Sequence, residues 1–228
     1  MELLDVLRST GAVRDFTDEP VDDATLTRVL DTARFAPSGG NAQAWHVVVV
    51  QDPAVRRRLR NLYLSGWYEY LALMQAGLRP WSPVNDRDAE ADAVAAAADI
   101  ASAAVPGFAE HLDTVPVLLA LFADLSGLAA IDRDAARYPF AGGASIYPFA
   151  WSILLAARSE GLGGVITTIA IREEQQVNAL LGASGPLALA AVIALGHPVK
   201  QPTHLRRAPV ASFATIDSID GPAFGDRS

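Results

Sequence analysis

The segment with the clearest capacity for chemistry is APSGGNAQAW, at residues 36–45. Its small residues let a ligand approach the backbone, and its amide and hydroxyl side chains offer both hydrogen-bond donors and acceptors. Such a loop suits a neutral polyol or a heterocycle. The same composition is also typical of an ordinary turn between a helix and a strand, so both interpretations stay open for this segment alone.

Arginine is the second source of chemistry. Arg14 lies in the run TGAVRDF, at residues 10–16, and Arg206 and Arg207 are adjacent near the end of the sequence. No acidic residue lies between residues 175 and 216, whereas the only lysine, Lys200, does, so an acidic chain keeps one locally positive strip. Arginine pairs well with phosphate, so this strip is a candidate phosphate site, with solvated surface charges as the alternative.

Several common kinds of site are excluded by the sequence. Without cysteine there is no thiolate nucleophile, disulfide, iron–sulfur cluster or Cys-ligated zinc. No Walker loop, HExxH or GxSxG motif occurs, and the histidines show no metal-binding i, i+4 pair. GLGGVI, at residues 161–166, lacks the third glycine of a dinucleotide-binding turn and follows a predicted helix, so it favours a helix cap leading into a strand. We expect no metal.

Composition limits the class of protein. The 228 residues are 51% hydrophobic and 19% charged, which is typical of a soluble globular protein. A net charge of -8 opposes general binding to nucleic acid or to an anionic membrane. Glu2 and Asp5 stand where a secretory signal would be basic, and no apolar run reaches the ~18 to 20 residues that span a bilayer. We therefore expect a cytoplasmic protein.

Hydrophobic periodicity predicts the elements that must position these residues. It predicts helices at residues 2–9, from about 23 to Pro37, 53–76, 145–159 and about 171–181, and buried strands at 45–50, 115–123 and 188–196. Residues 78–92 contain two prolines and no clear period, so a flexible loop is predicted there. No repeat or clean linker divides the chain, so we expect one domain over residues 1–228, with a helical and loop excursion at about 61–108.

Together these segments resemble the nitroreductase family of FMN-dependent oxidoreductases. The resemblance runs from about residue 3 to residue 209. It is carried by an Arg-x-Phe at 14–16, APSGGNAQAW, EGLGGVITT at 160–168, LGHP at 195–198 and a late Arg-x-Pro at 207–209. It implies an α+β fold with a central mixed β-sheet flanked by helices, and an intertwined homodimer with a C-terminal dimer arm from about residue 197.

The resemblance also assigns residues to a flavin held between two subunits. Arg14 would reach the pyrimidine edge or the phosphate, the Pro-Ser-Gly-x-Asn loop would come from the partner subunit, and the late arginine would bind the phosphate. The cofactor-binding residues implied are Thr10, Gly11, Ala12, Val13, Arg14, Pro37, Ser38, Gly39, Asn41, Gln43, Ile166, Thr167, Thr168, Arg206 and Arg207.

The sequence departs from the family pattern at three places. One is Gln43-Ala44-Trp45, where the family usually has Gln-Pro-Trp. Thr10, Gly11 and Ala12 stand where family members commonly have Arg-Arg-Ser, which removes one guanidinium and one hydroxyl from the implied flavin site. Trp151 and Ser152 stand in place of a frequent Gln-Asn pair, an exchange that could reshape or partly block the pocket.

The implied activity is ping-pong hydride transfer from NAD(P)H, through FMN, to a nitroaromatic, a quinone or a related small-molecule acceptor, with no side chain required as acid or base. Five aromatic residues between positions 63 and 81 predict a lid over the flavin, and from these we assign the substrate to Tyr63, Trp67, Tyr68 and Trp81. Packing of the helix onto the core is the alternative role for this cluster. The alternative functions are a reductive dehalogenase, an azoline dehydrogenase or a flavin-fragmenting enzyme of the same fold, and a non-catalytic flavin-binding protein.

Overall fold

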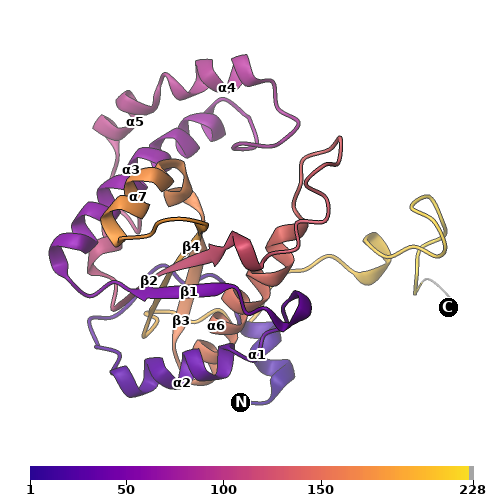
Figure 1. Ribbon diagram of the computed structural model, residues 1–228, viewed down its shortest axis with the longest axis horizontal. Coiled ribbons are helices and arrows are strands. Elements are labelled where there is room, and N and C mark those ends of the chain that lie inside the picture. The colour runs from indigo at the N-terminus through magenta and orange to yellow at the C-terminus, as the bar shows by residue number, and fades with distance from the viewer. Residues whose placement is uncertain (226–228) are drawn as a thin grey trace.

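A four-stranded sheet, covered by helices on both faces, organises the computed structural model, which describes residues 1–225 (Figure 1). The strands are β1 (Trp45–Val49), β2 (Val117–Asp124), β3 (Gly163–Thr167) and β4 (Leu187–Gly196), in the order β1-β2-β4-β3. The inner strands β2 and β4 are nearly continuous apolar runs, as strands buried on both faces must be. The three predicted strands are confirmed, and β3 is the strand into which GLGGVI leads.

The α+β class and the helix-flanked sheet are confirmed, but the expected mixed sheet needs correction. All three strand pairs are antiparallel, and the one parallel pairing in residues 1–225 is an isolated bridge between Ala12 and Gly164. The reason lies in the connection from β3 to β4, at residues 168–186. It returns to the end of the sheet that it left, whereas a parallel neighbour would require a crossover to the opposite end.

The helices form one layer on each face of the sheet (Figure 1). On one face lie α2 (Asp23–Ala33) and α6 (Tyr147–Ser159), with α1 (Leu3–Ser9) beside α6. On the other lie α3 (Pro53–Gln75) and α7 (Glu174–Leu181), and α4 (Arg87–Val94) and α5 (Ala97–Ala103) pack on the outer side of α3. The predicted helices are therefore confirmed, except that the last one starts with a 3-10 turn, Ile169–Glu173.

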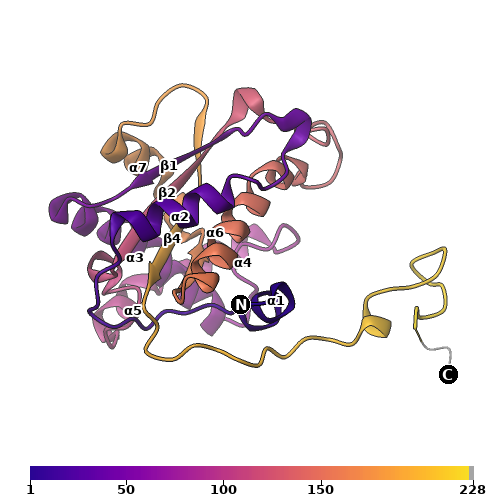
Figure 2. The same ribbon diagram turned by 90° about the horizontal axis from the view of Figure 1, so that it is seen from below.

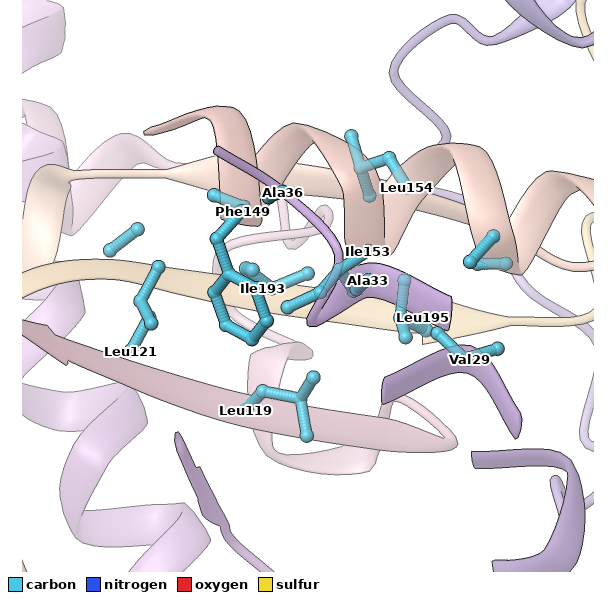
Figure 3. Packing of buried hydrophobic residues seen from close by; sticks show 14 of the residues in the cluster. Val29, Ala33, Ala36, Leu119, Leu121, Phe149, Ile153, Leu154, Ile193 and Leu195 are labelled. Carbon is cyan, nitrogen blue, oxygen red and sulfur yellow. The ribbon is translucent and has the colours of Figure 1, made fainter. Parts of the chain in front are cut away.

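Alternate residues of the inner strands fill two separate cores. Figure 3 shows the core under α2 and α6, which includes Val29, Leu119, Phe149, Ile153 and Ile193. The core under α3 and α7 includes Leu59, Tyr63, Leu118, Phe122 and Val192. Burying each of the large apolar side chains contributes roughly 1.5 to 3 kcal/mol, so both helical layers are fixed firmly to the sheet.

The segment predicted as a flexible loop, residues 78–92, is partly helical. The Asn85 side-chain amide donates to the Arg79 carbonyl at 2.7 Å and to the Glu90 carboxylate at 2.7 Å. Glu90 is buried and also pairs with Arg87 at 2.9 Å, in the first turn of α4. Two prolines break the apolar period here, but polar side chains supply the order that the period does not predict.

After β4 the chain runs along the N-terminal segment as far as Leu205 and then leaves the body of the protein in an extended arm (Figures 1 and 2). The arm carries apolar side chains that the rest of the chain leaves uncovered, such as Phe213, which is 71% exposed, and Phe224. That this arm binds a second subunit remains a prediction. No helix within residues 1–225 is both long and apolar enough to cross a membrane.

Candidate functional site

A cavity of about 850 Å³ lies between α3, α5, residues 104–110 and the end of β3. Seven of the residues that the sequence predicts or implicates in a site line it. They are Arg14, Tyr63, Trp67, Tyr70, Ile166, Thr167 and Thr168. The structure therefore brings together, within one chain, the implied cofactor residues of the Arg-x-Phe and GLGGVITT segments and part of the predicted substrate set.

Arg14 reaches the cavity because its segment is fixed along the edge strand β3. The Val13 amide donates to the Gly164 carbonyl at 2.9 Å, and the buried Val13 side chain anchors the segment. Four residues after Val13, the Thr17 amide donates to the His197 carbonyl at 2.9 Å. Arg14 lies between these two attachments with its side chain exposed, so its charge is available to a ligand.

The aromatic wall of the cavity is set by a close approach between α3 and the turn Ile169–Glu173. A Cβ atom on Gly66 would lie 2.9 Å from the Ile169 carbonyl oxygen, so only glycine permits this packing. Tyr63, Trp67 and Tyr70 occupy one face of α3 at helical spacing. Trp67 and Tyr70 stack with ring centroids 5.4 Å apart and planes 8° from parallel, a surface suited to a flat ligand.

The Tyr63 hydroxyl is the buried polar group of the cavity. Tyr63 is 2% exposed, and the Thr167 hydroxyl donates to its oxygen at 3.3 Å. Burial raises the pKa of Tyr63 above its ordinary value, although the hydrogen bond from Thr167 and the positive charge of Arg14 oppose this rise. Tyr63 is therefore protonated at neutral pH.

Two of the predicted substrate residues lie outside the cavity lining. The Tyr68 hydroxyl donates to the Glu110 carboxylate at 3.1 Å, and Glu110 also accepts from the Gly107 amide, so Tyr68 ties residues 107–110 to α3. Trp81 packs against Tyr70, with centroids 6.2 Å apart, and Arg172 covers its other face at 5.1 Å.

Tyr70 lines the cavity but was not among the predicted substrate residues. Its position three residues after Trp67 and seven after Tyr63 is the signal that places it on their face of the helix.

The loop from Pro37 to Gln43 lies at the other end of the sheet. It leads into β1, whose Trp45 pairs with Ala123 near the end of β2, whereas Gly164 pairs with Leu195, the partner of the first residue of β2. Asn41 and Gln43 have positive φ angles of 53° and 48°, a conformation that costs energy for residues other than glycine. The Ser38 hydroxyl accepts from the Gln43 amide at 3.0 Å, which helps to hold this shape.

The implied phosphate residues are brought beside the N-terminal segment. Leu205 Cδ2 lies 2.8 Å, and Pro202 Cγ 3.2 Å, from where a Cβ atom on Gly11 would be, so the chain passes directly over Gly11 just before Arg206 and Arg207. Both arginines are exposed.

Two further implied positions differ from the family expectation in what they offer a ligand. The buried Thr10 hydroxyl donates to the Val6 carbonyl at 2.7 Å and caps α1, so it is already engaged. Trp151, on α6, is 38% exposed and does not line this cavity, so within one chain it does not block it.

The comparisons with known proteins agree with this arrangement. The sequence model described as "Nitroreductase family" matches residues 7–197. Human iodotyrosine deiodinase 1 is 28% identical over 211 residues, which cover 92% of this chain and 66% of the deiodinase. The chain thus spans just under two thirds of that relative's length.

Two further relatives cover most of the chain. A NADH dehydrogenase of Thermus thermophilus is 30% identical over 197 residues, 85% of this chain and 86% of the relative. The solved structure of an NADPH:FMN oxidoreductase from Vibrio harveyi, in complex with NAD+, has the same fold with a TM-score of 0.64. The two sequences are 20% identical, and the match covers 95% of this chain and 77% of the oxidoreductase chain.

Proposed function

The chain belongs to the nitroreductase family, and from this premise we propose that it is an FMN-dependent oxidoreductase. It passes a hydride from NAD(P)H to a planar acceptor, such as a nitroaromatic or a quinone, in two half-reactions at one site. The observation that carries this proposal is the cavity in which Arg14 and the Ile166–Thr168 segment face a wall of stacked rings.

The residues present fit a flavin. The volume of about 850 Å³ lies within the range of cofactor and small-molecule sites, and leaves room for a second planar molecule. The donor set is also appropriate, because Arg14 offers a cation to an electron-rich heterocycle edge, and the hydroxyls of Thr167 and Thr168 line the same space.

A bound FMN supplies the two-electron chemistry, and the protein supplies binding, orientation and electrostatics. Arg14 would offer positive charge to a ring that gains electrons, which would favour its reduced state. Trp67 and Tyr70 would give a flat acceptor an apolar aromatic surface to pack against. Arg206 and Arg207 offer guanidinium groups to the phosphate, beside the backbone of Gly11.

The active protein is a homodimer in this proposal. One chain presents Arg14 and Ser38 at opposite ends of its sheet, so a flavin that uses both must lie between two chains. The extended arm, with Phe213 and Phe224 uncovered, supplies apolar surface that a second subunit can bury.

The absorption spectrum of the purified protein tests the proposal first. We expect bound flavin in the visible range, bleaching under anaerobic NADH or NADPH, and recovery of the spectrum on adding menadione or a nitroaromatic. A protein that carries flavin but is reduced by neither nicotinamide would not be an NAD(P)H-dependent reductase, and iodide release with dithionite as the reductant would then separate a dehalogenase from a non-catalytic flavin-binding protein. A protein that takes up no flavin would exclude both functions.

Reductive dehalogenation is the second candidate, supported by the similarity to human iodotyrosine deiodinase 1 over most of this chain. The same ring-lined cavity can take a halogenated phenol, from which two electrons and a proton would release a halide ion. Iodide release from 3-iodotyrosine or 2-iodophenol, with dithionite as the reductant, separates this activity from general acceptor reduction. Iodide release without turnover of menadione would favour the dehalogenase.

A further inference from the structure

Tyr63 has a role that ring stacking does not describe. Its ring is enclosed between α3 and the sheet at 2% exposure, and its centroid is 6.5 Å from that of Trp67, so it offers no open face to a ligand. Tyr63 nevertheless lines the cavity, and its hydroxyl is its polar group there.

The Tyr63 hydroxyl pairs with Thr167, which is the donor of this hydrogen bond. The Ile169 amide donates to the Thr167 hydroxyl oxygen at 3.5 Å, and Thr167 in turn donates its single proton to the Tyr63 oxygen at 3.3 Å. The Tyr63 oxygen therefore acts as an acceptor on one side. No hydrogen bond within residues 1–225 uses the proton of Tyr63 itself.

A buried donor without a partner is costly, so a group that satisfies it gains free energy on binding. The charged neighbours of the hydroxyl are Arg14, which cannot accept a hydrogen bond, and Glu110, which is engaged by Tyr68 and by the Gly107 amide. Neither takes the Tyr63 proton, and the cavity is the space that remains for an acceptor atom.

We infer that Tyr63 donates a hydrogen bond to an oxygen atom of the bound electron acceptor, and so selects planar compounds with a carbonyl or nitro oxygen over plain aromatic ones. This inference rests on the proposed function, in which the cavity holds the acceptor. The donor lies where the aromatic wall of α3 meets Thr167, so it also stabilises negative charge that develops on that oxygen during reduction.

The test is binding to the protein as purified, followed by quenching of tryptophan fluorescence, since Trp67 lines the cavity. The probes are menadione, which has two carbonyl oxygens, and 2-methylnaphthalene, which has none. The variants are Tyr63→Phe and, as the matched control, Tyr138→Phe, which removes the same atom from an exposed tyrosine that does not line the cavity. Flavin absorbance per protein is recorded for each.

We expect Tyr63→Phe to weaken menadione binding roughly three- to tenfold, the usual worth of one hydrogen bond, with flavin content and 2-methylnaphthalene binding unchanged. Tyr138→Phe should leave the binding of both probes unchanged. If Tyr63→Phe does not fold, Thr167→Val, which removes the anchor of the hydroxyl, is expected to give the same selective loss.

Three outcomes would overturn the inference. The first is equal menadione affinity in the wild type and in Tyr63→Phe. The second is loss of flavin from Tyr63→Phe with menadione binding intact, which would mean that Tyr63 donates to the cofactor. The third is a wild type that binds neither probe. If the wild type lacks flavin yet shows the selective menadione loss, the inference stands and the proposed function fails.

Discussion

The two ends of the sheet differ in how much of a site one chain completes. At the Arg14 end, helices and segments from distant parts of the chain enclose a cavity with a buried hydroxyl and stacked rings. At the Ser38 end, a loop with positive φ angles is turned outward, near aromatic residues such as Phe140, which is 71% exposed. A single chain therefore encloses a ligand cavity at the Arg14 end of the sheet, whereas at the Ser38 end it only exposes a loop on its surface.

The largest effect is expected from removal of the C-terminal arm. Deletion of residues 208–228 keeps both arginines of the strip but removes the uncovered apolar side chains of the arm. We expect a monomer by light scattering and an at least tenfold loss of flavin affinity, because the Ser38 end can then no longer meet the Arg14 end of another chain. A monomer with full flavin occupancy would show that the two ends work independently.

The next largest effect is expected at the phosphate. Arg207→Ala removes a charged hydrogen-bond donor worth ~1.5 to 3 kcal/mol, so FMN affinity should fall roughly ten- to a hundredfold. Titration of FMN into the apo protein, followed by fluorescence quenching, measures this loss. Arg133→Ala is the matched control, since Arg133 is an exposed arginine that pairs with its neighbour Asp134. The FMN affinity of this variant should equal that of the wild type.

Arg14→Ala should change the cofactor's potential more than its affinity. The guanidinium borders the cavity, so its loss removes charge that favours the reduced anion over the neutral oxidised ring. We expect a lower midpoint potential, measured by equilibration with a reference dye, whereas Arg207→Ala leaves the potential near that of the wild type. Equal affinity losses with unchanged potentials in both variants would contradict the two assignments.

Trp67 and Trp81, both near the Arg14 end, are expected to contribute differently to acceptor preference and to stability. Trp67 lines the cavity, whereas Trp81 packs behind Tyr70. Trp67→Ala should therefore change the ratio of the kcat/KM values for menadione and a nitroaromatic several-fold, because the loss of one aromatic contact has an effect on this order. Trp81→Ala should lower the thermal unfolding temperature and leave that ratio within about twofold. A larger change of this ratio in Trp81→Ala would support the predicted role of Trp81 in substrate binding.

The smallest effect is expected from Asp132, which orders the loop before α6 at the Ser38 end. Its carboxylate accepts from the Phe140 and Ala141 amides and from Arg137, which lowers its pKa from 3.8 to about 2. The stabilisation is therefore complete above about pH 4 and is lost as the pH falls toward 2.

Thermal unfolding of Asp132→Asn measures this contribution. We expect a lower unfolding temperature than the wild type at pH 6 and a difference that narrows below pH 4. Asp134→Asn is the control, since Asp134 is exposed and should show no such gap. A gap that persists unchanged at pH 2 would assign the effect to packing rather than to charge.

Local periodicity was sufficient to predict most of the elements, although not α4 and α5. The apolar spacing of α2, ending before Pro37, and the β-branched run of β1 required no knowledge of the rest of the chain. The same rule, applied more strictly, would have corrected the substrate set. Tyr68 follows Trp67 directly and so points about 100° around the helix from it, whereas Tyr70 shares its face.

Features that depend on contacts between distant segments could not be predicted from the sequence. The antiparallel sheet follows from where the β3 to β4 connection returns, and the order of residues 79–90 follows from the Asn85 and Glu90 hydrogen bonds. The hydrogen bond between Tyr63 and Thr167 joins residues 104 positions apart. The flavin assignments came from the family resemblance and stay predictions until a ligand is bound.

The contact between Gly11 and Leu205 restricts how this family member can diverge. A Cβ atom at position 11 would lie 2.8 Å from Leu205 Cδ2 and 3.2 Å from Pro202 Cγ. The leucine side chain can rotate away from a small residue, whereas the proline ring cannot. A larger residue at position 11, such as the arginine common in the family, therefore has to displace the segment that leads to Arg206 and Arg207, so a change at one of the implied flavin segments alters the position of the other.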